Sequence, residues 1–198
     1  MQKTGLIFVI SGPSGSGKTT LLRHLLKKRV LGNRLCRCVS VTTRPRRTGE
    51  RNGRDYIFIT ERDFKSRLKN KKILEWTKYL GYYYATPKDC LEAALAKGRV
   101  VGLCLDFRGA LKIKKLYPSS TVTIFVLPPS LQVLKNRISR RCSKICAEEV
   151  QKRIGLARQE LLLAKKYDYS VVNKDFDQAA DTLKEIMIKQ MRGHCRRY

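Results

Sequence analysis

The sequence predicts an α/β protein whose parallel sheet is covered by helices on both faces, which gives a three-layer core. Apolar stretches of strand length alternate with helical patterns along most of the 198 residues. The first apolar stretch runs directly into a glycine-rich loop. Between residues 36 and 86 the pattern changes to short alternating strands and turns. We therefore expect a small β-rich lobe on the core, and an arginine-rich lid later in the chain.

The first half of the chain supplies strands for both parts. Residues 6–10 are apolar and β-branched, which is typical of a buried parallel strand, and residues 20–28 carry leucines spaced for one helical face. Further strands are expected at 35–41 and 56–59. Thr60 is a favourable N-cap for a short helix at 61–68. The stretches 73–79 and 82–85, separated by Leu80 and Gly81, predict a hairpin.

The second half returns to alternation of helix and strand. Pro87 favours the first turn of a helix that ends at residue 97. Residues 100–106 form a buried strand that ends in Asp106, and the carboxyl ends of parallel strands are where ligand groups gather. The rest of the pattern predicts strands at 121–127 and 169–172, and helices at 109–116, 130–140, 147–165 and 175–191.

The glycine-rich loop carries the first chemical signal. It matches G-x-x-x-x-G-K-[ST] and lies between a predicted strand and a predicted helix. Its glycines allow successive backbone N–H groups to turn inward on a polyphosphate at a helix N-terminus. Lys18 adds a cation for the β- and γ-phosphates, and the Thr19 hydroxyl is placed to ligate Mg²⁺. The predicted ATP site comprises Gly12, Pro13, Ser14, Gly15, Ser16, Gly17, Lys18, Thr19 and Thr20.

A second anion site is predicted in the loop at residues 42–56. The loop contains four arginines within a short span: Arg44, Arg46, Arg47 and Arg51. Planar guanidinium groups bind phosphate in a bidentate manner, whereas a purely solvated basic loop is the alternative interpretation. Farther on, the acid Glu75 lies inside an apolar and aromatic strand. It is either a solvent-facing position or a hydrogen-bond acceptor in a pocket.

Composition limits the classes of function. The 43 Lys and Arg against 16 Asp and Glu give a formal net charge of +27, so weak, salt-sensitive binding of nucleic acid is expected on charge alone. The basic residues are spread along the chain without an aromatic RNA-binding motif, which favours a solvated surface. We see no apolar span of about 18 residues and no signal peptide, and expect a soluble, cytoplasmic protein. The seven cysteines form no C-x₂-C pair, which favours reduced thiols.

Several motifs in one order carry a resemblance to a known family. The longest is Ser40-Val-Thr-Thr-Arg44-x-x-Arg47-x-Gly-Glu50-x-x-Gly53-x-x-Tyr56-x-Phe58. After it come Leu74-Glu75-Trp76, Tyr83-Tyr84-x-Thr86, Leu105-Asp106-x-x-Gly109-Ala110, Leu127-Pro-Pro-Ser130 and Asp168-Tyr-x-Val-Val-Asn173. Over nearly its whole length the chain resembles nucleoside monophosphate kinases of the guanylate kinase type.

The resemblance implies phosphoryl transfer from ATP to GMP or dGMP with Mg²⁺ as cofactor. It implies that the phosphate of GMP is held by Ser40, Arg44, Arg47, Tyr56 and Tyr84, that guanine is read by Glu75, Thr86 and Asp106, and that Glu50 orients the arginine loop. The catalytic cations would be Lys18, Arg44, Arg137, Arg141 and Arg153. Guanine offers N1–H and N2–H₂ donors on one edge, which a carboxylate accepts as a pair and which adenine lacks.

The same resemblance divides the chain into functional parts. We expect one domain over residues 1–198, with a nucleotide-binding core at 1–35, 87–136 and 160–198, a GMP-binding lobe at 36–86, and a lid at 137–159. The oligomeric state stays open between monomer and homodimer.

Four features depart from the family pattern. Cys104 stands where the family usually has the first acid of an Asp-x-Asp pair near Mg²⁺, Arg108 replaces Gln, and Ala85 replaces Gly. The lid also lacks the usual Arg-Gly pair. Two of its thiols, Cys142 and Cys146, form only half of a tetrahedral zinc site.

Three other functions remain as alternatives. A ribosyl-phosphate kinase of related fold would share the first loop but should lack the set formed by Arg44, Arg47, Tyr56 and Glu75. A non-catalytic scaffold of guanylate-kinase-like fold typically loses the phosphate loop, which is intact here. A dedicated nucleic-acid-binding protein rests on charge alone.

Overall fold

A parallel five-stranded sheet lies at the centre of the protein in a computed structural model, which describes residues 5–28, 31–141 and 147–195. The strand order is β2-β7-β1-β8-β9, and every neighbouring pair is parallel. The strands are β1 (Leu6–Ser11), β2 (Leu35–Arg37), β7 (Val100–Cys104), β8 (Thr121–Leu127) and β9 (Tyr169–Val172). All of them present their carboxyl ends at one edge, where ligands bind in sheets of this kind.

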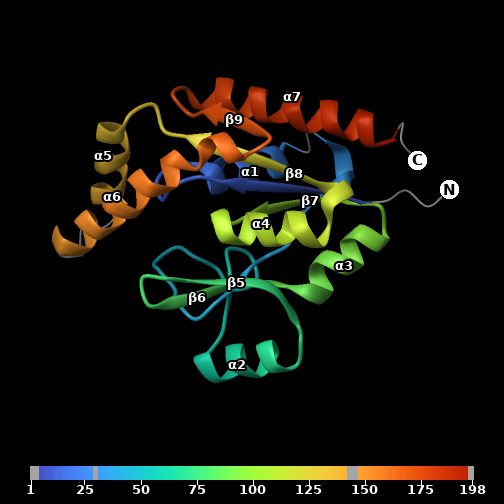
Figure 1. The fold of residues 1–198 in the computed structure, drawn as a ribbon, viewed down its shortest axis with the longest axis horizontal. Coiled ribbons are helices and arrows are strands. Elements are labelled where there is room, and N and C mark those ends of the chain that lie inside the picture. Colours follow the sequence, from blue (N-terminus) through green and yellow to red (C-terminus); the bar gives the residue numbers. More distant parts are fainter. Residues whose placement is uncertain (1–4, 29–30, 142–146, 196–198) are drawn as a thin grey trace.

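Helices cover both faces of this sheet, as the sequence predicts (Figure 1). Helices α1 (Lys18–Lys27) and α7 (Phe176–Cys195) lie on one face, and α3 (Lys88–Ala96) and α4 (Phe107–Leu116) on the other. Successive side chains of β1 enter the two cores in turn: Phe8 and Ile10 pack toward α1 and α7, whereas Ile7 and Val9 pack toward α3 and α4. This alternation explains why β1 is apolar at every position.

A second, four-stranded sheet forms the lobe at the bottom of Figure 1. Its order is β4-β3-β6-β5; β3 runs parallel to β4 and antiparallel to β6, and β5 and β6 form the predicted hairpin. The elements are β3 (Val41–Thr42), β4 (Ile57–Phe58), α2 (Glu61–Lys69), β5 (Ile73–Tyr79) and β6 (Tyr82–Pro87). Thr60 caps α2 as expected, because its hydroxyl accepts the backbone N–H of Asp63 at 3.1 Å.

Two helices project from the core on the side opposite the chain termini (Figure 1). Helices α5 (Leu131–Arg141) and α6 (Ala147–Leu162) pack on each other through Leu134, Ile138 and Ala157. Their small shared core leaves most of both helices outside the central layers. Short 3₁₀ helices at Gly32–Arg34, Pro118–Ser120 and Ala164–Lys166 complete the connections.

Two expected strands were wrong in their extent. The single strand expected at 35–41 is divided: β2 ends at Arg37 in the core sheet, and β3 begins at Val41 in the lobe sheet. The strand expected at 100–106 ends at Cys104. Asp106 instead caps α4, where its carboxylate accepts the backbone N–H of Gly109 at 2.8 Å. An apolar run shows where strand conformation is favoured, but not which partner strand each residue meets.

Other element boundaries moved by a few residues at their ends. Pro87 closes β6 and is the N-cap of α3 instead of lying in its first turn. The helix expected at 147–165 ends at Leu162, and a 3₁₀ turn follows it. The last helix continues to Cys195, past the expected end at residue 191.

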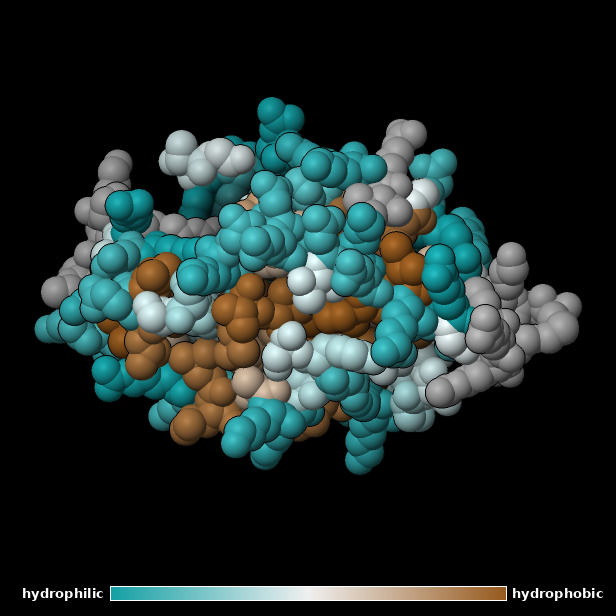
Figure 2. Space-filling model, turned by 90° about the horizontal axis from the view of Figure 1, so that it is seen from above, coloured by the Kyte–Doolittle hydropathy of each residue, from teal (hydrophilic) through white to brown (hydrophobic). Residues whose placement is uncertain are grey.

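Most of the surface seen from the α7 side is hydrophilic, and an irregular apolar strip crosses it (Figure 2). Within the described part of the chain, four charged side chains are buried: Arg44, Asp55, Glu75 and Arg153. Most of the excess positive charge therefore contacts solvent, as the sequence indicates. None of the described helices is both long enough and apolar enough to cross a bilayer.

Candidate active site

The phosphate loop joins the carboxyl end of β1 to the first turn of α1, as predicted. Gly17 takes a left-handed conformation with φ of 94° and precedes the helix. A Cβ atom at this position would lie 2.2 Å from Nδ2 of Asn173. That amide donates to the backbone oxygen of Ser16 at 2.7 Å. Asn173, which follows β9, therefore holds the phosphate loop in place. Asn173 ends one of the family motifs but is not among the predicted site residues; its place directly after a parallel strand is the sequence signal that points to it.

Lys18 folds back over the loop that carries it. Its ammonium donates to the backbone oxygens of Gly12 at 2.7 Å and Pro13 at 3.3 Å. These bonds place the cation at the mouth of the loop, against neutral carbonyl acceptors. A triphosphate would offer stronger, charged acceptors at the same place.

Thr19 and Cys104 meet beside this lysine. The hydroxyl of Thr19 hydrogen-bonds the thiol of Cys104, which ends β7. Burial raises the pKa of this thiol, despite the opposing cations of Arg37 and Lys18, so Cys104 stays neutral. No cluster of three or more His, Cys, Asp or Glu side chains suited to a metal occurs among the residues that the structure describes. The Thr19 hydroxyl is the predicted oxygen donor for a metal at the loop, and Cys104 beside it offers only a neutral thiol.

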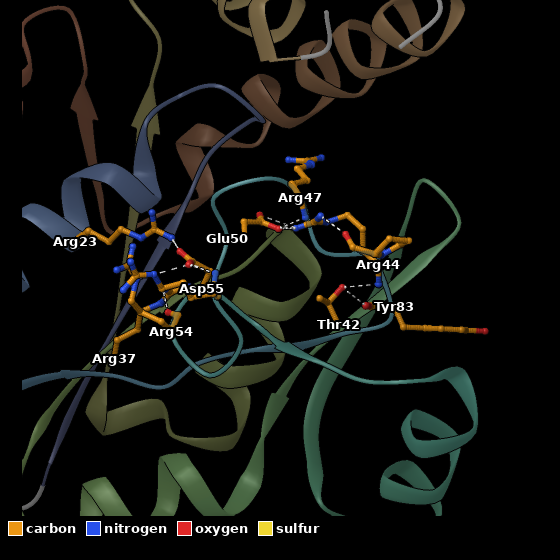
Figure 3. Close-up of polar contacts among 11 residues, drawn as sticks. Arg23, Arg37, Thr42, Arg44, Arg47, Glu50, Arg54, Asp55 and Tyr83 are labelled. Atoms are coloured by element: carbon orange, nitrogen blue, oxygen red, sulfur yellow. Dashed lines mark hydrogen bonds and ion pairs between the residues drawn. The ribbon is translucent and has the colours of Figure 1, made fainter. Parts of the chain in front are cut away.

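The arginine loop is built around a buried ion pair. Arg44 donates to both carboxylate oxygens of Glu50, at 2.8 and 2.9 Å, and Glu50 also accepts the backbone N–H of Arg47 at 2.9 Å. Burial would raise the pKa of Glu50, yet the backbone of Arg47 and the side chain of Arg44 lower it overall. Glu50 therefore lies where it can orient Arg44, and the guanidinium of Arg47 extends away from this pair (Figure 3).

Aromatic rings cover the other side of Arg44. Its guanidinium lies 5.6 Å from the ring centre of Tyr56 and 5.8 Å from that of Phe58. Tyr84 packs edge-on against Tyr56 with a centroid distance of 5.8 Å. Ser40, just before β3, is buried, and its backbone oxygen accepts the N–H of Ile57 in β4 at 2.9 Å. The predicted phosphate-binding residues thus gather in one part of the lobe.

A buried acid, Asp55, anchors this loop to the core (Figure 3). Its carboxylate pairs with Arg23 from α1, lies 3.7 Å from the Arg54 guanidinium, and accepts the backbone N–H of Arg51 at 2.8 Å. Arg37 of β2 donates to the backbone oxygen of Asp55 at 2.9 Å. Burial and the neighbouring arginines lower the pKa of Arg23. The sequence analysis did not single out Asp55, Arg23 or Arg37, because contacts between distant chain segments leave no local pattern.

The other buried acid in the described part of the chain is Glu75, in the middle of β5. It faces inward, only 6% exposed, and its carboxylate accepts the hydroxyl of Thr86 at 2.5 Å from the neighbouring strand β6. Burial first, and then the charge of Asp106, raise the pKa of Glu75 to about 7. The solvent-facing alternative for Glu75 is therefore wrong.

Gly109 makes room for this acid. A Cβ atom on Gly109 would lie 2.7 Å from the second carboxylate oxygen of Glu75. The first turn of α4 thus brings the core against the lobe, with Asp106 at its N-cap. Glu75, Thr86 and Asp106, which are far apart in sequence, form one polar cluster where lobe and core meet.

The predicted arginines of the lid are placed unequally. Arg137 of α5 lies over the phosphate loop, 3.4 Å from the oxygen of Gly15 and 3.5 Å from that of Asn173. Arg153 of α6 is buried. The side chain of Arg141 lies outside the described residues, as do Cys142 and Cys146. Glu160 of α6 was not predicted; burial raises its pKa, and the positive charge of Lys18 opposes this shift in part.

Comparison with known proteins identifies the family. The family model described as guanylate kinase matches residues 4–190. The chain belongs to the guanylate kinase family. A guanylate kinase of Caldanaerobacter subterraneus is 41% identical over 190 residues, which cover 96% of this chain and 90% of that protein. One of Synechocystis is 40% identical over 183 residues, covering 92% of this chain and 93% of the relative.

Structural comparison agrees with this membership. The crystal structure of guanylate kinase from Anaplasma phagocytophilum superimposes with a TM-score of 0.80 at 30% identity, covering 96% of this chain and 88% of that chain. Both the three-layer α/β core and the family resemblance predicted from the sequence are therefore confirmed. Kinases of this family generally need a divalent metal.

Proposed function

We propose that this protein transfers the γ-phosphoryl group of ATP to GMP or dGMP, giving ADP and the corresponding diphosphate. The observation that carries the proposal is the polar cluster of Glu75, Thr86 and Asp106, in which Glu75 and Thr86 are buried. An ionised carboxylate there accepts the paired N1–H and N2–H₂ donors of guanine. Adenine offers no such pair and would leave Glu75 buried and unsatisfied.

The two predicted phosphate sites would bind different nucleotides, GMP in the lobe and ATP at the core. In the lobe, Arg44 and Arg47, with Ser40, Tyr56 and Tyr84, would hold the GMP phosphate. Glu50 keeps the Arg44 fork oriented through two short hydrogen bonds. At the core, the loop from Gly12 to Thr20 would hold ATP, and Lys18 would exchange its carbonyl partners for phosphate oxygens.

Catalysis in this arrangement is positioning and charge neutralisation. The attacking phosphate oxygen is already ionised, so no general base is required. Lys18, Arg44 and Arg137 would surround the transferred group between the two phosphate sites, and Arg141 and Arg153 would act from the lid. Charge that develops on the transferred group is stabilised there, and closure of the lid excludes water that would otherwise hydrolyse ATP.

The metal proposed for this reaction is Mg²⁺. It would neutralise charge on the β- and γ-phosphates when bound. The donors of this chain fit an ion held chiefly by the nucleotide and water, because Thr19 supplies a hard oxygen whereas Cys104 supplies a neutral thiol. We propose that Cys104→Asp lowers the free Mg²⁺ concentration needed for half-maximal rate; an unchanged requirement would exclude Cys104 from the metal's surroundings.

Three further assignments belong to the proposal. We infer a division into a core (1–35, 87–136, 160–198), a GMP-binding lobe (36–86) and a lid (137–159). We also place the protein in the cytoplasm, as a monomer or homodimer. Binding to nucleic acid would be non-specific and salt-sensitive, through the net charge of +27.

The test is a coupled assay of ADP formation with GMP, dGMP, AMP, CMP and UMP as acceptors. The proposal expects turnover with the two guanine nucleotides and little with the others. Equal turnover with GMP and AMP would contradict guanine reading by Glu75. Absence of turnover with every acceptor, with ATP and GMP still bound, would make the protein a binding module.

A further inference from the structure

Two cysteines meet where the chain crosses between the core sheet and the lobe sheet. Cys38 follows β2 of the core and precedes β3 of the lobe. Cys90 lies in the first turn of α3, on the return path from β6 of the lobe to β7 of the core. The pair therefore joins the outward crossing to the return crossing.

The two thiols are in contact and differ in exposure. Cys38 is buried, with its Sγ 3.9 Å from the backbone oxygen of Pro87, and its side chain hydrogen-bonds that of Cys90. Cys90 is exposed, and its sulfur also accepts the backbone N–H of Val39. An oxidant can therefore reach one sulfur, while the other is held beside it within the fold.

The pKa values of the two thiols also differ: the exposed Cys90 is the more acidic and the buried Cys38 the less acidic. The hydrogen bond from Cys38 is the largest influence on Cys90 and lowers the pKa of its thiol to about 6. The same contact, together with burial, raises the pKa of Cys38. A position in the first helical turn also favours a thiolate. Near neutral pH, Cys90 is thus the nucleophile and Cys38 the protonated partner.

We propose that Cys38 and Cys90 form a redox-active dithiol, which a peroxide converts into an intramolecular disulfide. The Cys90 thiolate attacks one peroxide oxygen; an S–O bond forms, the O–O bond breaks, and the hydroxide that leaves takes up a proton to become water. Cys38 then attacks the sulfenic sulfur, an S–S bond forms, the S–O bond breaks, and a second water leaves with the Cys38 proton. Two thiols are oxidised and one peroxide is reduced.

The disulfide would covalently link the two chain segments that connect the lobe to the core. If the lobe moves relative to the core, the backbone of the two connections at residues 38–40 and 87–88 has to change conformation. A covalent link between them restricts that movement. The neighbouring Cys36 serves as the matched control, because it is half-buried and burial raises the pKa of its thiol.

Peptide mapping tests the pairing independently of kinase activity. Trypsin cleaves after Arg37 and so separates Cys36, in peptide 35–37, from Cys38, in peptide 38–46; Cys90 falls in peptide 89–97. The folded protein is treated with a threefold molar excess of hydrogen peroxide, enough to carry an unpaired thiol to the sulfinic acid; remaining thiols are alkylated, and the digest is analysed by mass spectrometry. We expect peptides 38–46 and 89–97 linked, about 2 Da below the sum of the reduced masses, and separated by dithiothreitol.

Variants and denaturation sharpen the result. Cys36→Ser should leave the linked peptide unchanged, Cys90→Ser should abolish it, and Cys38→Ser should leave Cys90 oxidised to sulfinic acid. In urea the specific linkage should give way to a mixture of pairings. Linkage of Cys90 to Cys36, sulfinic Cys90 without linkage in the wild type, or the same linkage in urea would overturn the proposal. Because Cys90 is exposed, Cys90→Ser keeps the test valid even if Cys38→Ser does not fold.

Discussion

The two phosphate-binding regions of this molecule are held together in different ways. In the lobe, Arg44 and Glu75 are buried and make side-chain hydrogen bonds of 2.8 and 2.5 Å to charged or hydroxyl partners. At the core, Lys18 contacts backbone carbonyls, and Arg137 reaches the loop at 3.4 and 3.5 Å. The lobe site is thus preassembled by its own partners, whereas the cations of the core and lid contact neutral backbone carbonyls, which the charged oxygens of a triphosphate would displace. Under the proposed function, guanine selectivity would reside in the preassembled lobe, and the catalytic charge would be assembled around the triphosphate.

The largest effect should come from the core side. Lys18→Ala should reduce turnover by about a thousandfold or more, since it removes a cation that neutralises developing charge on the phosphates. The measurement is the steady-state rate of ADP formation at saturating GMP, with Lys18→Arg as the variant that keeps the charge. A loss of less than tenfold would mean that Lys18 does not act on the transferred group.

The next largest effect should depend on the substrate: Glu75→Ala should slow the reaction with GMP much more than any reaction with AMP. Glu75→Ala should reduce kcat/KM for GMP by about one to two orders of magnitude, the equivalent of about 1.5–3 kcal/mol for a hydrogen bond to a charged group. Any weak activity on AMP should change much less. Equal losses on both nucleotides would show that Glu75 only supports the strands β5 and β6.

A smaller effect should follow from releasing the arginine loop from the core. Asp55→Asn keeps the shape but removes the charge that pairs with Arg23. We expect a loss of about 1–3 kcal/mol in the free energy of unfolding, because Asp55 is buried while Arg23 is partly exposed to water. Urea unfolding measures it, and Asp181→Asn on helix α7 is the control, because that carboxylate is 70% exposed and, among the described residues, pairs only with the surface residue Lys184 at 3.5 Å. An unchanged stability in Asp55→Asn would contradict an anchoring role.

The smallest expected effect is the release of protons when GMP binds. Free Glu75, with a pKa of about 7, is largely protonated at pH 6, and guanine requires its ionised form. GMP binding at pH 6 should therefore release close to one proton from Glu75, falling to about a tenth at pH 8. Calorimetry in buffers of different ionisation enthalpy measures the release. The GMP phosphate itself titrates near pH 6, so Glu75→Gln supplies the background. Identical release by the two proteins would contradict the assignment.

The sequence predicted those parts of the site that are local in the chain. The phosphate loop and the cap by Thr60 depend on neighbouring residues, and both appear as expected. The gathering of Glu75, Thr86 and Asp106 was known only through the family resemblance, since no spacing rule connects them. Asp55 with Arg23 and Arg37, and Asn173 against Gly17, were missed because long-range packing brings them together. The division of residues 35–41 between two sheets was missed for the same reason.

The most direct test of a preassembled lobe and a ligand-assembled core is GMP affinity in the absence of ATP. Calorimetric titration would compare the wild type with Lys18→Ala and Glu75→Ala. The account predicts that Lys18→Ala binds GMP within about twofold of the wild type, whereas Glu75→Ala binds about 10- to 100-fold more weakly. Loss of GMP affinity in Lys18→Ala equal to that in Glu75→Ala would show that the two regions form one site, and would contradict the account.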